Sequence, residues 1–257
     1  MKNSALLFFA SILFSNTINA QLKPVKYADG NQALNGLSIK AAKKSAQNPG
    51  ILLLPAWLGI DNASKEIAEN LSKLGYHVFI ADIYGEGNYP KNTAEAGKQA
   101  GYYKTNFKEY QKRIDLALQE LIKSGANADN IVAIGYCFGG TGILEAVRGN
   151  LKLKGAASFH GGLGKDASRP AAPITTKVLI CHGADDPFVS KEEITAFQQE
   201  MRDSKADWQM IYYANSVHSF TNPEAGNDNS KGAAYNPVAA KRSFEHLQLF
   251  LNEVLKK

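Results

Sequence analysis

Short apolar runs alternate with amphipathic stretches along most of this chain. The run at 51–55, Ile-Leu-Leu-Leu-Pro, is apolar at every position, as expected of a strand that is covered on both faces. Further short apolar runs predict strands at 77–82, 131–136, 155–159, 177–182 and 208–213. Because strands and helices alternate, the predicted fold class is α/β, with a mostly parallel central sheet and helices on both faces.

Apolar residues at helical spacing mark the segments between these strands. Helices are predicted from about residue 61 to Gly75, over about 110–124, after the strand at 131–136, over about 190–202, and near the C-terminus. Two leading strands between Val25 and Ile39 are expected to pair as a hairpin. The Gly-, Asn- and Lys-rich segment 84–106 is predicted to be partly helical and to overhang the carboxyl ends of the strands, where sites form in such sheets.

The first twenty residues differ from the rest of the chain. Lys2 is the only charged residue before Lys23, and residues 5–14 are apolar apart from Ser11. This pattern is typical of a secretory signal peptide, and the apolar run is short for a membrane span. We therefore expect residues 1–20 to be a signal peptide and residues 21–257 to form one domain. The mature protein is expected to be periplasmic or secreted, without a stable membrane anchor; an uncleaved anchor is the alternative.

Composition and charge narrow the class of partner. Of 257 residues, 44% are hydrophobic, which is enough for a sizeable core. The formal net charge is +5, from 29 basic and 24 acidic residues, and the lysines are scattered rather than gathered in a run. We therefore expect no nucleic-acid partner, and we expect a monomer that acts on a small molecule.

The stretch 131–142, Ile-Val-Ala-Ile-Gly-Tyr-Cys-Phe-Gly-Gly-Thr-Gly, carries the strongest chemical signal. An apolar strand leads into a Gly-x-Cys-x-Gly-Gly turn and then a helix, which is the pattern of a nucleophile elbow with Cys137 at its tip. Gly135 and Gly139 are expected to allow strained backbone dihedrals, and Gly140 is expected to let the helix pack closely on the strand. A plain strand–turn–helix with an inert cysteine is the alternative.

A thiol nucleophile needs a base, and the base needs an acid that orients it. Among five histidines, His218 lies just after the last predicted strand and is the candidate base, with an exposed loop histidine as the alternative. For the acid, Asp185 and Asp186 both follow a predicted strand, and Asp186 is preferred because Pro187 makes its turn rigid. The chain order Cys137, Asp186, His218 is that of the α/β-hydrolase triad.

Three motifs, in this order and spacing, resemble the dienelactone hydrolase family: Gly135-Tyr-Cys-Phe-Gly-Gly140, Gly183-Ala-Asp-Asp-Pro-Phe-Val189 and His218-Ser-Phe220. The loops at 55–60 and 81–85 also fit, so the resemblance covers nearly all of the chain from Ile51 onward. It implies an α/β-hydrolase fold and a Cys-Asp-His triad that works without a metal or an organic cofactor.

The resemblance assigns Cys137 as nucleophile, His218 as base and Asp186 as the acid that orients it. In this fold the backbone N–H after the nucleophile and one from an earlier loop hold the oxyanion, here those of Phe138 and Trp57. The implied activity is hydrolysis of small carboxylic esters or lactones through a thioester acyl-enzyme, like that of a carboxymethylenebutenolidase. A non-catalytic or weakly catalytic small-molecule-binding protein on the same fold is the alternative.

Two departures from the family pattern bear on the substrate. Dienelactone-cleaving members carry a glutamate in the loop after the early strand, where Ala56 stands here, and an arginine shortly after His-Ser-Phe, where Thr221 and Asn222 follow here. Cys137 is then expected to depend on His218 and on the N-terminus of the next helix for its ionisation. The departures leave open whether a carboxylate is recognised.

Other residues near the predicted strand ends carry weaker signals. His160 and Tyr136 are weak candidates for substrate contact, with a structural histidine as the equal alternative for His160, and His182 is expected to be a buried hydrogen-bonding residue. No close ligand pair of the metalloprotease or zinc-finger kind occurs, so no metal site is predicted. The two cysteines, Cys137 and Cys181, are expected not to form a disulfide, although a reversible thiol redox role is an alternative.

Overall fold

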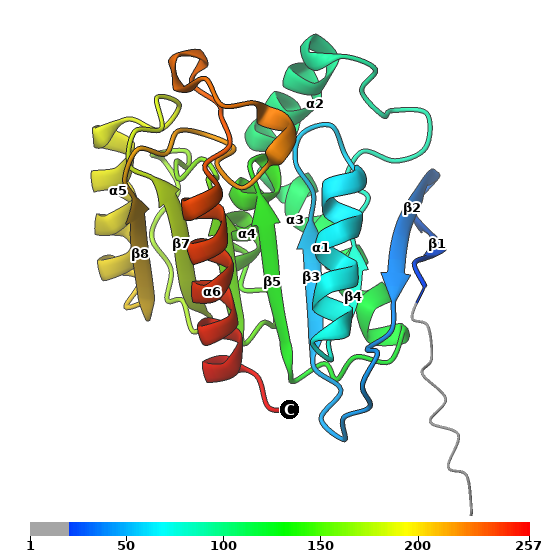
Figure 1. The fold of residues 1–257 in the computed structure, drawn as a ribbon. Coiled ribbons are helices and arrows are strands. Elements are labelled where there is room, and N and C mark those ends of the chain that lie inside the picture. The colour runs from blue at the N-terminus through cyan, green and yellow to red at the C-terminus, as the bar shows by residue number, and fades with distance from the viewer. Residues whose placement is uncertain (1–20) are drawn as a thin grey trace, which may run out of the picture.

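The predicted alternation of strands and helices is confirmed over residues 21–257, the part of the chain that the computed structural model describes (Figure 1). The predicted signal peptide, residues 1–20, lies outside the described residues and stays a prediction. The strands are β1 (Lys23–Asp29), β2 (Gln32–Ile39), β3 (Gly50–Leu54), β4 (His77–Ile80), β5 (Ile131–Tyr136), β6 (Gly155–Phe159), β7 (Lys177–Gly183) and β8 (Trp208–Tyr213). The helices are α1 (Asn62–Lys73), α2 (Thr93–Thr105), α3 (Phe107–Lys123), α4 (Phe138–Arg148), α5 (Lys191–Asp203) and α6 (Pro237–Val254).

All eight strands form one sheet, in the order β1-β2-β4-β3-β5-β6-β7-β8. The pairs β1–β2 and β2–β4 are antiparallel, and every other pair is parallel. Crossovers that contain helices return the chain to the same end of the sheet, except between β6 and β7, where the connection has no helix. The register places Leu54 beside Gly135, and Phe159 beside Cys181. The carboxyl ends of β3, β5, β6 and β7 therefore meet at one edge.

Two hydrophobic layers cover the faces of the sheet. Helices α1 and α6 lie on one face, and α3, α4 and α5 lie on the other (Figure 1). The strand β3 is apolar at every position because its side chains enter both hydrophobic layers. Its Ile51 and Leu53 belong to the core under α1 and α6, whereas Leu52 and Leu54 belong to the core under α3 to α5. Each of these four side chains is fully buried, which is typical of a central parallel strand.

Polar side chains cap the first turns of α1, α5 and α6. Asp61 caps α1, accepting from the N–H of Ser64, whose hydroxyl accepts from the N–H of Asp61 in return. The side chain of Ser190 caps the N-terminus of α5, and the side chain of Asn236 caps that of α6, just before Pro237. These caps satisfy the free N–H groups of the first turns, so each helix starts at a defined distance from its strand.

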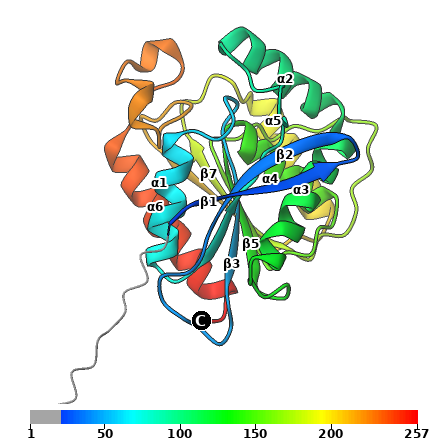
Figure 2. The ribbon, with the colours of Figure 1, turned by 90° about the vertical axis from the view of Figure 1, so that its right-hand side faces the viewer.

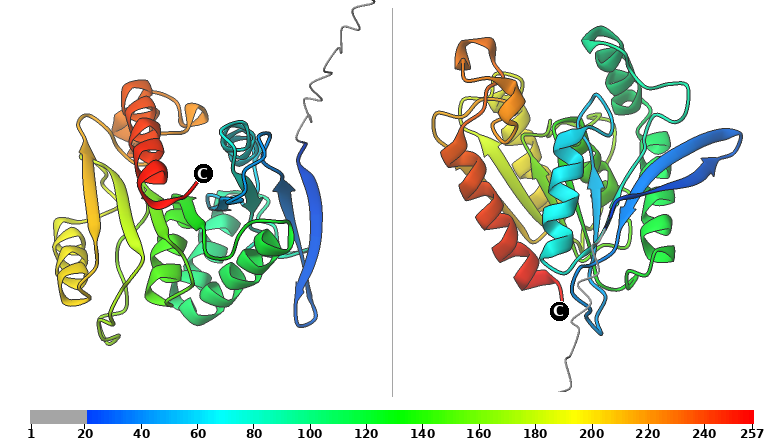
Figure 3. Two further views of the ribbon diagram at one scale, coloured as in Figure 1. Left: turned by 90° about the horizontal axis from the view of Figure 1, so that it is seen from below. Right: turned by 45° about the vertical axis from the view of Figure 1, so that its right-hand side comes forward.

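The predicted leading hairpin is confirmed at one edge of the sheet. β1 and β2 pair along their whole length around a tight turn in which Gly30 has a φ of 57°. The carboxylate of Asp29 pairs with Arg113 of α3 at 2.8 Å and also with Lys112. These ion pairs hold the hairpin against α3, and it extends beyond the rest of the sheet (Figure 2 and Figure 3).

Two segments rise beyond the carboxyl ends of the parallel strands. One is α2, which confirms that the segment 84–106 is partly helical and overhangs this edge (Figure 1). The other is the connection from β8 to α6, which contains the short 3-10 helices η1 (Pro223–Ala225) and η2 (Asn229–Lys231). Within residues 21–257, no helix combines the length and apolarity needed to cross a bilayer.

Candidate active site

Cys137 lies at the tip of a sharp turn between β5 and α4, as the elbow pattern predicts. Its backbone has φ 54° and ψ −116°, a conformation that residues with a side chain rarely adopt. The N–H of Cys137 donates to the carbonyl of Phe159 on the neighbouring strand, which fixes the turn. His160 and Ser219 also have positive φ values, 40° and 57°. Backbone strain therefore gathers around one point of this sheet edge.

The roles expected for the elbow glycines need a correction. Neither Gly135 nor Gly139 has a positive φ; the strained dihedrals belong to Cys137 itself. The two glycines are needed for close approach instead. A Cβ on Gly135 would collide with the backbone of Gly139, and a Cβ on Gly139 would collide with the backbone of Leu54. Gly140 has the expected role, because a Cβ there would meet Ser158 and Gly161 next to the strand β6.

The structure brings His218 to the sulfur of Cys137. The loop after β8 is tied to the segment before α6 by two hydrogen bonds, from the N–H of His218 to the carbonyl of Gly232 and from the N–H of Ala234 to the carbonyl of His218. In this position, Nε2 of His218 lies 3.0 Å from Sγ of Cys137. The ring of Phe188 stands edge-on to the imidazole, with 5.4 Å between the ring centres.

Asp186, and not Asp185, lies against the other nitrogen of His218. Its Oδ2 is 3.0 Å from Nδ1 of His218, and its Oδ1 accepts from the N–H of Phe188 at 2.9 Å. Asp186 is buried, whereas Asp185 is exposed. A hydrogen bond from the N–H of Asp186 to the carbonyl of Gly183 closes the turn that separates the two carboxylates. The sulfur, the imidazole and the buried carboxylate thus form one continuous hydrogen-bonded line.

The hydrogen bonds among Cys137, His218 and Asp186 shift the pKa values of Cys137 and His218. Burial disfavours the charged imidazole, but the hydrogen bonds to Asp186 and Cys137 outweigh it and raise the pKa of His218 to about 9. Burial alone would raise the pKa of Cys137, but the hydrogen bond from His218 outweighs it, helped by the N–H of Phe138, and the net effect lowers that pKa. The geometry therefore favours a thiolate beside an imidazolium.

The two candidates for the oxyanion hole, Trp57 and Phe138, belong to different segments. Phe138 is the first residue of α4, and Trp57 lies in the loop after β3, which the hydrogen bond from the N–H of Gly59 to the carbonyl of Ala56 closes. Within residues 21–257, neither the N–H of Trp57 nor that of Phe138 donates to a carbonyl oxygen. The N–H of Phe138 instead acts on the sulfur of Cys137, whose pKa it lowers. The oxyanion hole at Trp57 and Phe138 stays a prediction.

A small cavity of about 50 Å³ opens beside Cys137. Ala56 and Asn222, the two positions that depart from the family pattern, both line it. The lining residues include one carboxylate, that of Asp61, and no lysine or arginine. They are Pro55, Ala56, Asp61, Ala63, Ser64, Ile67, Tyr136, Cys137, His160, Ser219, Thr221 and Asn222.

His160 and Tyr136, the two weak candidates for substrate contact, both line this cavity. The Nε2 atom of His160 lies 2.8 Å from the hydroxyl oxygen of Thr221, and its Nδ1 is buried with no partner among the described residues. Burial, together with the charge of nearby His218, lowers the pKa of His160 well below its usual range, so the ring stays neutral. The sequence singles out Thr221 only as a departure from the family pattern. No local pattern predicts its hydrogen bond to His160, which is 61 residues away in the chain.

His182 and Cys181 are not part of this arrangement. His182 is buried with its ring edge-on to Tyr212, and its Nδ1 has no hydrogen-bond partner within residues 21–257. Cys181 is fully buried in the core under α1 and α6. Both cysteines are free thiols, in agreement with the expectation of no disulfide. Among residues 21–257 no group of three or more acidic, histidine or cysteine side chains could hold a metal ion.

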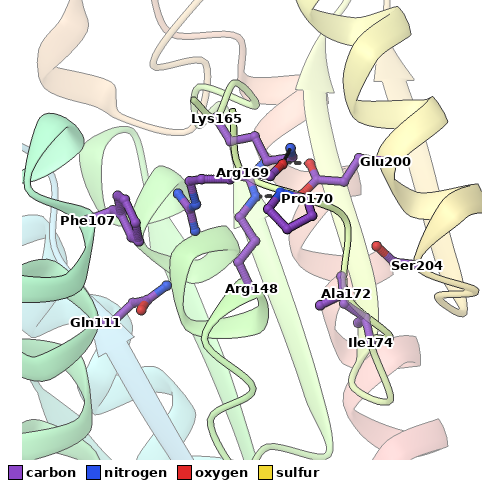
Figure 4. A pocket seen from close by; sticks show the side chains of 10 residues that line it. All are labelled: Phe107, Gln111, Arg148, Lys165, Arg169, Pro170, Ala172, Ile174, Glu200 and Ser204. Atoms are coloured by element: carbon purple, nitrogen blue, oxygen red, sulfur yellow. Dashed lines mark hydrogen bonds and ion pairs between the residues drawn. The ribbon is translucent and has the colours of Figure 1, made fainter. Parts of the chain in front are cut away.

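A second cavity, of about 220 Å³, is lined by residues of α3, α4, α5 and the loop before β7, and its charged residues come from α4, α5 and the loop (Figure 4). All five N–H groups of Arg148 are used. They donate to the carboxylates of Glu145 and Glu200 and to the carbonyls of Leu163 and Gly164. Because Arg148 has no donor left for a ligand, this cluster ties the end of α4 to α5 and to the loop, and it anchors the elbow helix from the side opposite Cys137.

Comparison with known proteins gives a family. The family model described as "Dienelactone hydrolase family" matches residues 37–255. A protein of Bradyrhizobium sp. named "Probable 2-oxo-3-(5-oxofuran-2-ylidene)propanoate lactonase" is 24% identical over 213 residues, which are 79% of this chain and 83% of that protein.

Solved structures agree with this assignment. The crystal structure of a dienelactone hydrolase-like promiscuous phosphotriesterase from metagenomic libraries is 33% identical with a TM-score of 0.86, and the match covers 92% of this chain and 99% of that one. A structure named m3DLH is 32% identical with a TM-score of 0.87 and the same coverage. The predicted α/β-hydrolase fold is thereby confirmed.

Proposed function

The chain belongs to the dienelactone hydrolase family, and we propose that this ester or lactone hydrolase works through Cys137, His218 and Asp186. The observation that carries the proposal is the hydrogen-bonded line from Sγ through the imidazole to the buried carboxylate, with 3.0 Å at each step. A nucleophile, a base and an orienting acid in contact are the requirements of covalent acyl transfer.

In the first half of the reaction the thiolate of Cys137 attacks the carbonyl carbon of the ester. The carbonyl electron pair moves to oxygen, and the N–H groups of Trp57 and Phe138 stabilise the resulting oxyanion. When the oxyanion collapses, the bond to the alkoxy oxygen breaks, and His218 gives its Nε2 proton to that oxygen. An ester releases an alcohol, whereas a lactone keeps its hydroxyl on the acyl chain. Both leave a thioester on Cys137.

In the second half His218 is neutral and acts as a base. It takes a proton from a water molecule while the water oxygen attacks the thioester carbon, and the same two N–H groups hold the second oxyanion. Collapse breaks the carbon–sulfur bond, releases the carboxylic acid and restores the thiolate beside the imidazolium. The role of Asp186 is to hold Nδ1–H of His218 so that Nε2 faces the sulfur.

The cavity beside Cys137 supports a small uncharged acyl group. A carboxylate-bearing acyl group would meet Asp61 and find no cationic side chain in the lining. Among esters of one phenol, we therefore expect acetyl and propionyl esters to be cleaved at least about tenfold faster, by kcat/KM, than a succinyl half-ester of similar size. Asn222→Arg should narrow this difference, and Asn222→Gln is the matched control.

The non-catalytic alternative is disfavoured by the same geometry, because a binding protein has no need of an aligned thiol, imidazole and carboxylate. A reversible pairing of Cys137 with Cys181 is disfavoured because burial of Cys181 raises its pKa to about 12, so it is not a thiolate at neutral pH. Export through a leader at residues 1–20 remains part of the proposal. Mass spectrometry of the protein after secretion should then give Gln21 as its first residue.

The acyl-enzyme itself tests the mechanism. Rapid mixing with an activated aryl acetate, acid quenching and peptide mass spectrometry should show one acetyl group on the peptide that contains Cys137 and none on the peptide that contains Cys181. Hydroxylamine should remove it, as expected of a thioester. Steady turnover with the acetyl group on another residue, or with no adduct at any time after mixing, would contradict the proposal.

A further inference from the structure

Two buried tyrosines hold the two residues of the predicted oxyanion hole. The hydroxyl of Tyr84 donates to the carbonyl oxygen of Trp57 at 2.7 Å, and the hydroxyl of Tyr110 donates to the carbonyl oxygen of Phe138 at 3.0 Å. Trp57 and Phe138 come from different segments, the loop after β3 and the start of α4. Nothing in the local sequence relates them, so their relative position depends on contacts of this kind.

Tyr84 contacts both of these residues. Its hydroxyl holds Trp57, and its ring is stacked on that of Phe138, with 5.6 Å between the ring centres and 16° between the planes. Tyr84 is itself fixed by the loop after β4. There the buried carboxylate of Asp82 accepts from the N–H of Gly85 at 2.9 Å and from the N–H of Asn35 at 2.8 Å. Burial raises the pKa of Tyr84, which keeps its hydroxyl a donor at any working pH.

Tyr110 supports Phe138 from the other side. The two rings are stacked at 4.7 Å with 6° between the planes, so the Phe138 ring lies against both tyrosines. Tyr110 is fully buried on α3. A Cβ on Gly142, one turn into α4, would collide with its hydroxyl. The small residue at 142 therefore lets Tyr110 reach the first turn of the elbow helix.

We propose that Tyr84 is a positioning residue that sets the spacing of the Trp57 and Phe138 N–H groups, with Tyr110 in a supporting role. Two donors stabilise one oxyanion only when both lie at hydrogen-bond distance from the same point, and an error of about half an ångström weakens such a site. Tyr84 joins the two donors' residues directly, through a hydrogen bond on one and a ring stack on the other. This inference rests on the proposed function of the site.

Tyr84→Phe removes only the hydroxyl and keeps the ring stack on Phe138. The expected result with an aryl acetate is a kcat about tenfold lower with KM within about twofold, because the lost interaction matters mainly when the oxyanion forms. Alkylation of Cys137 by iodoacetamide should keep the wild-type rate and pH dependence, since the sulfur displaces iodide without forming an oxyanion. A trifluoromethyl ketone, which adds the thiolate and becomes an oxyanion, should bind about tenfold more weakly.

Two further variants complete the test. Tyr110→Phe should lower kcat about threefold, because its bond is longer and Phe138 keeps its place at the helix start. Tyr213→Phe is the matched control, since this buried tyrosine bonds His246 at 2.7 Å in the other core layer. Its kcat, alkylation rate and ketone affinity should all stay at the wild-type values.

The inference is overturned if Tyr84→Phe keeps the wild-type kcat, or if its alkylation rate falls in parallel with kcat, which would place the effect on the thiolate. Unchanged ketone affinity in Tyr84→Phe would also overturn it. Should the folded Tyr84→Phe protein prove unobtainable, Tyr110→Phe decides by the same three readouts. Failure of the proposed function gives a different result, because the Cys137→Ala variant would then turn over the ester as fast as the wild-type enzyme. In that case the inference about Tyr84 would fail as well.

Discussion

The two cysteines of this protein lie in opposite environments, although both are near the carboxyl ends of parallel strands in the same sheet. Cys137 follows β5 at a strained turn, half-buried, with His218 3.0 Å from its sulfur. Cys181 lies inside β7 with its side chain fully buried, and within residues 21–257 its sulfur has one hydrogen-bond partner, the hydroxyl of Tyr213 at 3.6 Å. Burial raises the pKa of Cys181 to about 12, whereas the contact with His218 lowers that of Cys137.

The difference shows what lowers the pKa of one thiol and raises the pKa of the other. Burial acts on both sulfurs in the same direction, against the thiolate. Only Cys137 has a basic partner that compensates, and only its backbone turns the side chain out of the sheet toward a cavity. Reactivity in this chain therefore follows from a contact and a backbone conformation rather than from the residue type.

Replacing each cysteine in turn by alanine should give the largest expected difference in activity between the two positions. Cys137→Ala should lower kcat/KM for an aryl acetate at least about a thousandfold, because no other group can form the acyl-enzyme. Cys181→Ala should leave kcat/KM within about twofold. Equal losses in the two variants, or full activity in Cys137→Ala, would contradict the comparison. Cys137→Ser serves as a control of shape and should keep a small fraction of the activity.

Removing the carboxylate behind His218 is expected to have the next largest effect. Asp186→Asn should lower kcat about a hundredfold to ten-thousandfold, because an amide N–H directed at Nδ1 favours the tautomer with its proton on Nε2, and Nε2 then cannot take a proton from the attacking water. Asp185→Asn changes the neighbouring exposed carboxylate and should leave kcat within about twofold. Steady-state kinetics of both variants at one pH decides which aspartate orients the base.

The reactivity of the two thiols toward iodoacetamide should differ across pH. Because the pKa of Cys137 is lowered, its alkylation should reach half its maximal rate below the ~8.5 of a free thiol. His218→Ala should move that midpoint upward, since burial then acts without compensation. Cys181 should stay unmodified until the protein is unfolded. A midpoint for Cys137 at or above that of free cysteine would contradict the thiolate.

For stability we expect the opposite ranking of the two cysteines: substituting Cys181 should cost more free energy of unfolding than substituting Cys137. The effects should be smaller than those on activity. Cys181→Ser places a hydroxyl in an apolar core, and urea unfolding should show a loss of about 1–2 kcal/mol. Cys137→Ser lies at a cavity and should cost less than about 0.5 kcal/mol. If the two losses proved equal, the contrast in burial between the two sulfurs would be wrong.

Local patterns predicted the elements well and their fine geometry less well. The elbow was recognised from its Gly-x-Cys-x-Gly-Gly spacing, but the strained dihedrals belong to Cys137, and the glycines serve close packing. The rigid turn before Pro187 favoured Asp186 over Asp185, and the structure places Asp186 against His218. The bond between His160 and Thr221 had no local signal at all.

What the sequence alone determined is the set of strands and helices, the small residues at the elbow, and the chain order of the proposed nucleophile, acid and base. These depend on neighbours within a few positions, which set periodicity, caps and turns. Only the tertiary structure decided that Cys137 and His218, 81 residues apart, are in contact, and that Tyr84 holds Trp57. Such distances depend on the summed geometry of several crossovers and packed layers. The pKa of the Cys137 thiol is likewise decided by the tertiary structure, because it depends on burial and on partners that come together only in the folded chain.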